Sequence, residues 1–226
     1  MPGRLRGRAA LDVLTFTRAA LACYFTFIAV FYTAKLMALR ARTGRRHAER
    51  GRAGTAQWFG HTLFIVLRAG IWAICLARVA APGIDGWFGP LLPITTAPVA
   101  GLGLAFLAAS LGGVVYIHSF LGEAWRSGVG AGRPAALVTG GPYARVRHPL
   151  FVAVGTGQIG FVLAWPSLFS LACLGLGITS LIVQAQYEER HMEAWFGPAW
   201  RSYANRTPAF WPPSGPGQAG DGVPGA

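Results

Sequence analysis

Charged residues, and acidic residues above all, are scarce in this sequence of 226 residues. Only 12% of the residues are charged, against about a quarter in an average soluble domain, and the chain holds just eight Asp and Glu. Residues 86–122 and 149–187 contain no Asp, Glu, Lys or Arg. About 20 apolar residues suffice to cross a bilayer, so these runs exclude an ordinary soluble domain and predict an all-α, polytopic membrane protein.

Lysine and cysteine are also rare. Lys35 is the only lysine among 20 basic residues, which favours a GC-rich bacterial source. The formal net charge of +12 raises the possibility of a nucleic-acid partner, but the arginines lie between the apolar runs without interleaved aromatics. They are typical of topology signals, and we expect no nucleic acid to bind. The three cysteines sit in apolar stretches without CxxC spacing, so neither a disulfide framework nor a metal site is predicted.

Hydropathy predicts about five membrane-spanning helices, the last two forming a hairpin about Trp165-Pro166-Ser167. Arginines cluster at 40–52 and between 118 and 148, so both loops should face the cytoplasm, in a bacterial plasma membrane. Five spans with a cytoplasmic C-terminus put the N-terminus outside. The four arginines before the first span argue against that placement, unless this segment is an interfacial helix. The predicted spans are 19–39, 58–81, 94–117, 150–164 and 167–187. The predicted regions are an N-terminal segment (1–18), three transmembrane helices (19–117), a core of connector, hairpin and post-membrane helix (118–211), and a disordered tail (212–226).

Three features within or beside the spans carry further expectations. Arg68 lies mid-span, where charge is a functional hypothesis by default, and is a candidate to bind an acceptor carboxylate. The alternative is snorkelling or pairing with a backbone carbonyl. Arg206 is a second candidate for substrate binding, whereas Arg78, near the outer end of its span, is expected to be an interfacial anchor. Small residues in the third span suggest its close-packing face: Gly101, Ala105, Ala108 and Gly112.

Two polar clusters bracket the predicted hairpin, one at 137–149 (LVTGGPYARVRHP) and one at 187–191 (YEERH). Because the two arms run out and back, both clusters should meet at the cytoplasmic end. Their ionisable side chains are Arg147, His148, Glu188, Glu189 and His191.

The string LVTGGPYARVRHPLF, a short helical hairpin, EER and then FGPAWRSYANRTPAFWP together resemble the C-terminal half of the isoprenylcysteine carboxyl methyltransferase and phospholipid methyltransferase families. The resemblance covers roughly 121–212. It implies an integral-membrane enzyme that uses S-adenosylmethionine (SAM), with the cofactor bound at the cytoplasmic surface and a lipidic acceptor entering from the bilayer. The cofactor residues it implies are Val138, Gly141, Tyr143, Arg147, His148, Pro149, Glu188 and Glu189.

The acceptor is less well determined than the cofactor. A carboxylate on a prenyl-like or other lipidic molecule comes first, a phospholipid amine second and a small thiol third. An amine or thiol would need a general base, for which His148 and Glu188 are the catalytic candidates. Phe151, Ala153 and Trp200 stand where the family usually has Tyr, Gly and Tyr, which bears on acceptor identity more than on fold. A scaffold or small transporter that binds no SAM is the alternative of another class.

Overall fold

The computed structural model describes residues 2–44, 54, 56–125 and 134–210. These residues form helices and no named strand. The predicted tail at 212–226 and most of the Arg-rich loop lie outside the described residues. The α-helices are α1 (Pro2–Thr43), α2 (Ala56–Ala80), α3 (Ala97–Leu121), α4 (Pro149–Ala164), α5 (Leu168–Phe196) and α6 (Pro198–Arg206), and the short 3₁₀ helices are η1 (Pro82–Phe88), η2 (Leu92–Ile94), η3 (Gly122–Ala124) and η4 (Gly141–Ala144).

Helices α1, α2, α3 and α5 are each long and apolar enough to cross a membrane, and α4 is a shorter apolar helix. The all-α, polytopic prediction is therefore confirmed. Helix α4 has 16 residues and is about 24 Å long at about 1.5 Å per residue, somewhat less than the hydrocarbon core of about 30 Å. The segment 2–18 runs into the first span as one continuous helix, α1.

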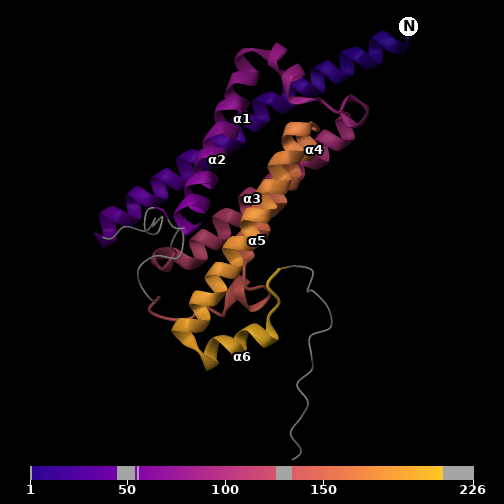
Figure 1. The fold of residues 1–226 in the computed structure, drawn as a ribbon. Helices are drawn as coiled ribbons and strands as arrows, with labels where there is room; N and C mark the ends of the chain where they lie inside the picture. The colour runs from indigo at the N-terminus through magenta and orange to yellow at the C-terminus, as the bar shows by residue number, and fades with distance from the viewer. Residues whose placement is uncertain (1, 45–53, 55, 126–133, 211–226) are drawn as a thin grey trace, which may run out of the picture.

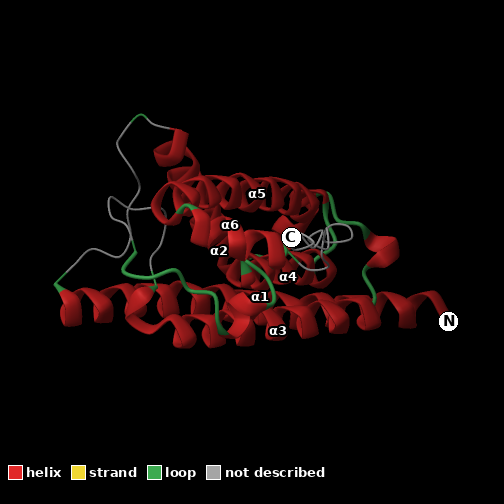
Figure 2. Ribbon diagram, turned by 90° about the horizontal axis from the view of Figure 1, so that it is seen from below, coloured by secondary structure: helices red, strands yellow, loops and turns green. Residues whose placement is uncertain are grey.

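The helices run alternately up and down, so that one end of the bundle collects α6, the start of α4 and the end of α5, far from the N-terminus (Figure 1). Seen from below, α4 lies between α3 and α5 (Figure 2). Helix α5 continues nine residues past the predicted end of its span, because no helix breaker occurs before Gly197 and Pro198. The polar residues from Glu188 onward thus extend a membrane helix.

The α4–α5 turn forms where Trp165-Pro166-Ser167 predicts it. Ser167 caps α5, its Oγ accepting from Ser170 N–H at 3.1 Å while the Ser170 side chain accepts from Ser167 N–H. The turn also pairs with the loop between α2 and α3, through Leu91 N–H to Pro166 O and Leu168 N–H to Gly89 O, both at 2.9 Å. These bonds tie the hairpin to the first half of the chain at the end opposite α6.

The close-packing face predicted for α3 is wrong. A Cβ added at Gly101 or Gly112 would meet nothing within 4 Å, whereas a Cβ at Gly103 would overlap the backbone nitrogen of Ala164 in α4. In return, a Cβ at Gly160 would lie 2.8 Å from the Gly103 carbonyl oxygen. The buried face of α3 is Ala100, Gly103, Leu107, Ser110, Val114, Ile117 and His118.

The expectation that Arg78 is an interfacial anchor is also wrong, because its side chain is completely buried. Its Nε donates to Asp85 Oδ1 at 2.5 Å, and its guanidinium carbon lies 3.5 Å from the centroid of the Trp165 ring. Arg18 reaches the same carboxylate, with Nε 2.9 Å from Asp85 Oδ2. The acidic residue of the loop between α2 and α3 thus holds two arginines, from α1 and α2, inside the protein.

Candidate functional site

The C-terminal segment folds back over the connector. Residues 207–210, which we call the strap, pair with the backbone just before α4: Arg147 N–H donates to Pro208 O at 2.8 Å and His148 N–H to Ala209 O at 3.2 Å. From α6, Tyr203 O–H donates to Tyr143 O at 2.7 Å. Burial raises the pKa of Tyr203 to about 12, so this phenol keeps its proton. The strap and α6 therefore fix the connector against the end of α5.

Arg147 and Glu189 form the ion pair that joins the connector to α5. Glu189 Oε1 accepts from Arg147 Nε and from His148 Nε2, each at 2.9 Å, and lies 2.8 Å from Arg147 Nη2. Arg147 Nη1 donates to the carbonyls of Ala204 (2.9 Å) and Thr207 (2.6 Å). All three guanidinium nitrogens of Arg147 thus have partners within the protein. Glu189 is not among the residues that line the cavity described below.

Glu188 is differently placed. Its Oε1 accepts from Gln184 Nε2 at 3.2 Å, one helical turn earlier, and its Oε2 lies 3.7 Å from His148 Nδ1. Because Nε2 of His148 donates to Glu189, Nδ1 is the ring nitrogen on the Glu188 side. The buried imidazole also stacks on Phe151, with centroids 5.3 Å apart. The site therefore contains an oriented histidine beside a carboxylate that faces open space.

That open space is a polar cavity of about 150 Å³, lined by α1, α2, α4, α5 and the connector. Tyr143, Arg147, His148 and Glu188 are in its wall. Trp125, only 3% exposed, also lines it, and its indole Nε1 has no hydrogen-bond partner among the described residues. Burial is the main reason why the pKa of the Tyr143 phenol is raised, so that side chain too stays neutral.

A second, mostly apolar cavity of about 110 Å³ adjoins the first, deeper in the bundle. The two share Tyr32, Phe64, Arg68 and Val154 as lining residues. The guanidinium carbon of Arg68 lies 4.7 Å from the centroid of the Tyr32 ring and 5.5 Å from that of Phe64. Within the described ranges no carboxylate is at ion-pair distance from Arg68, so an unpaired cation stands at the junction.

Several predicted site residues lie outside both cavity walls. Gly141 has φ +59°, and a Cβ there would overlap the Phe120 ring, so it shapes the connector's backbone. Pro149 is the buried first residue of α4, Val138 is half-buried in the connector, and Arg206 is exposed at the end of α6. A role for these residues in binding stays a prediction.

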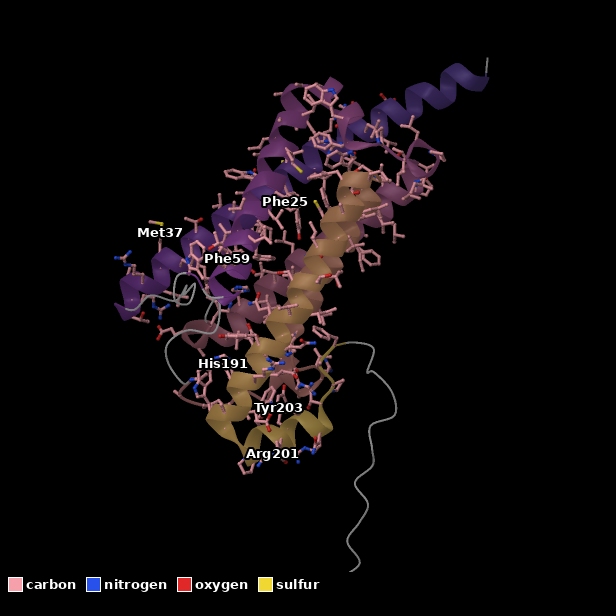
Figure 3. The ribbon with its side chains drawn as sticks, viewed as in Figure 1. Phe25, Met37, Phe59, His191, Arg201 and Tyr203 are labelled. Atoms are coloured by element: carbon pink, nitrogen blue, oxygen red, sulfur yellow. The ribbon has the colours of Figure 1, made fainter. Side chains whose placement is uncertain are left out.

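His191 also stands apart from the cavity. It bonds the Tyr187 carbonyl of its own helix through Nδ1 at 2.9 Å. It lies with Arg201 and Tyr203 at the α6 end, well away from Phe25 among the spans (Figure 3). Across the described part of the chain, no group of three His, Cys, Asp or Glu side chains could hold a metal ion.

Sequence reasoning missed Trp125, Gln184 and Tyr32. Gln184 had a signal, since it is a polar residue in an otherwise apolar run, four residues before Glu188 and therefore on the same helix face. Trp125 and Tyr32 had none, because aromatic residues near span ends are common and only the fold brings α1 over the connector.

Comparison with known proteins agrees with this geometry. Residues 99–199 match the family described as Phospholipid methyltransferase, which confirms the resemblance and indicates a membrane methyltransferase. The chain is 32% identical over 154 residues to the Cobalt-zinc-cadmium resistance protein CzcN of Cupriavidus metallidurans, covering 64% of this chain and 63% of that protein. It is 29% identical over 149 residues to the Nickel-cobalt-cadmium resistance protein NccN of Alcaligenes xylosoxydans xylosoxydans, covering 64% of each. It thus spans just under two thirds of these curated relatives, and no solved structure matches it.

Proposed function

We propose that this chain, whose residues 99–199 match the phospholipid methyltransferase family, transfers a methyl group from SAM to an amphiphilic acceptor delivered by the membrane. The observation that carries the proposal is that two cavities share four lining residues, one of the cavities being the more polar and near the connector, the other apolar and between the spans. An amphiphile is divided in the same way, into a polar head and an apolar tail. Our first choice of acceptor is a carboxylate on a prenyl-like or other lipidic molecule.

The polar cavity fits the cofactor by the chemistry of its donors. SAM carries a sulfonium, an ammonium and a carboxylate, and it supplies both the methyl group and the leaving group when bound. Glu188 offers its carboxylate to the ammonium or the ribose hydroxyls. The Trp125 N–H, which has no partner among the described residues, can donate to an anionic or adenine acceptor, and the Tyr143 ring offers aromatic surface. Arg147 is already paired with Glu189, so its role is to hold the wall of the polar cavity in place.

At the junction, Arg68 is placed to bind the acceptor's carboxylate, with the tail in the apolar cavity. Such a carboxylate is ionised and needs no general base, so alignment and exclusion of water are the protein's main contributions. For an amine or thiol acceptor, Nδ1 of His148 would accept the proton, since Glu189 holds the opposite nitrogen. Phospholipid or small-molecule N- or S-methylation is therefore the second candidate.

The two curated relatives are named for resistance to metal ions. In the described residues of this chain no side-chain cluster suited to metal binding occurs. We therefore propose that a part in metal resistance would act through the methylated product. We place the enzyme in a bacterial plasma membrane with the polar cavity toward the cytoplasm, because the arginines concentrate at that end.

The test is calorimetry of S-adenosylhomocysteine binding to detergent-purified protein. We expect Glu188→Gln to weaken binding by at least about tenfold, as for loss of one charge-assisted hydrogen bond. Glu193→Gln is the control, since that carboxylate is 53% exposed and pairs only with Arg201 on the surface. No binding by the wild type would refute the enzyme and favour a scaffold or transporter. Labelled SAM supplied to membranes then identifies the product: alkali releases labelled methanol from a methyl ester but not from an N-methyl group.

A further inference from the structure

The apolar cavity contains one amide that the proposed reaction does not use. Gln158 of α4 lines this cavity, and its Oε1 is buried without a hydrogen-bond partner among the described residues. A primary amide surrounded by hydrocarbon is costly unless it is paired. Polar side chains at membrane depth are therefore functional hypotheses by default.

Helix α5 makes room for this amide. Gly177 faces it, and a Cβ at that position would overlap both the nitrogen and the oxygen of the Gln158 side chain. Two other polar groups of the same wall are already paired with each other, because Tyr24 and Ser110 share a hydrogen bond of 3.0 Å beside Gly157. The fold thus keeps the amide inside the bundle and offers its oxygen no partner from the described residues.

The position of the amide sets a distance. Gln158 follows His148 by ten residues, which is about 15 Å along α4 at about 1.5 Å per residue. The amide is therefore remote from the polar site, where it would meet the acceptor's tail and not its head. Arg68, which lines both cavities, lies on the path between them.

We propose that the acceptor's tail carries a hydroxyl group remote from its anionic head, and that Gln158 binds this hydroxyl. A hydroxyl both donates and accepts, so it pairs with the amide whichever way the amide is turned. An unsubstituted acyl or prenyl tail leaves the amide unpaired and is the poorer ligand. This inference rests on the proposed function, because it takes the apolar cavity as the site of the acceptor's tail.

The experiment uses three fatty acids of equal length and charge as probes: stearate, 12-hydroxystearate and 2-hydroxystearate. Their affinities are measured by calorimetry on the full chain in lipid nanodiscs. The wild type should bind 12-hydroxystearate about five- to tenfold more tightly than the other two, the value of one net hydrogen bond. Gln158→Leu should bind all three equally. Ser180→Ala, which changes another polar residue of the same cavity wall, should keep the preference.

Equal affinities in the wild type, a preference that survives Gln158→Leu, or no binding of any probe would each overturn the proposal. S-adenosylhomocysteine affinity is measured on the same samples, and an unchanged value in Gln158→Leu shows that the variant is folded. Gln158→Met is the second variant in case Leu is not accommodated. Failure of the cofactor to bind, with the fatty-acid preference intact, would reject the methyltransferase and leave the tail site standing.

Discussion

Replacing Arg147 by Met should release α6 and the strap without unfolding the rest of the bundle. The substitution removes the ion pair and one hydrogen bond to Glu189, and one hydrogen bond each to the carbonyls of Ala204 and Thr207. The paired side chains are 15% and 28% exposed, so the expected cost lies between about 1 kcal/mol for a surface pair and about 3–5 kcal/mol for a broken buried pair. We take about 3 kcal/mol, equivalent to roughly a hundredfold shift in the local opening equilibrium.

Hydrogen exchange measured by mass spectrometry is the assay, because it resolves local opening from global unfolding. Amides of 198–210 should exchange roughly a hundredfold faster in Arg147→Met, while those of α3 and α4 keep their wild-type rates. The control is Arg201→Met, whose pair with Glu193 spans 3.4 Å between side chains that are 59% and 53% exposed. It should change exchange by no more than about twofold. If both variants opened α6 equally, Arg147 would not be what holds this segment.

Three further outcomes follow from packing, buried charge and pKa. Gly103→Ala places a methyl group against α4 and should lower the free energy of unfolding by about 2–3 kcal/mol, whereas Gly101→Ala on the open face should change it by less than about 0.5 kcal/mol; thermal unfolding in detergent compares them. Asp85→Asn leaves Arg78 buried without its counter-ion and should lower the free energy of unfolding by about 3 kcal/mol or more. Adding Arg78→Met to the same chain should restore part of that loss, and a failure of this rescue would contradict the buried pair. The raised pKa of Tyr203, about 12, means that above pH 10 the phenol ionises in the unfolded chain but not in the folded one, so stability should fall between pH 10 and 12 in the wild type and less steeply in Tyr203→Phe.

The meeting of the two polar clusters followed from the sequence alone. Out-and-back arms of a hairpin return to one end whatever their packing, and Arg147 and Glu189, 42 residues apart, do pair there. The turn at Trp165-Pro166-Ser167 was equally predictable, since proline cannot continue a helix and serine caps the next one.

Packing faces and partners were not predictable in the same way. Small residues lie on two sides of α3, and periodicity cannot say which side meets α4; the partner glycine, Gly160, decides it. The burial of Arg78 depends on Asp85, which comes from a loop whose fold no local pattern indicates. Likewise the division of labour between Glu188 and Glu189 arises from where the strap holds Arg147, so two adjacent identical residues could not be told apart beforehand.

The backbone pairing of 147–148 with 208–209 also has a consequence for biosynthesis. All five apolar helices precede the strap in the chain, so they can enter the membrane before residues 207–210 leave the ribosome. Until that segment arrives, the connector lacks its partners and the polar cavity lacks a fixed wall. The end of the bundle that holds the polar cavity is therefore the last part of the molecule to be assembled, and a ribosome that stalls before residue 207 produces a chain whose connector has no strap to hold it.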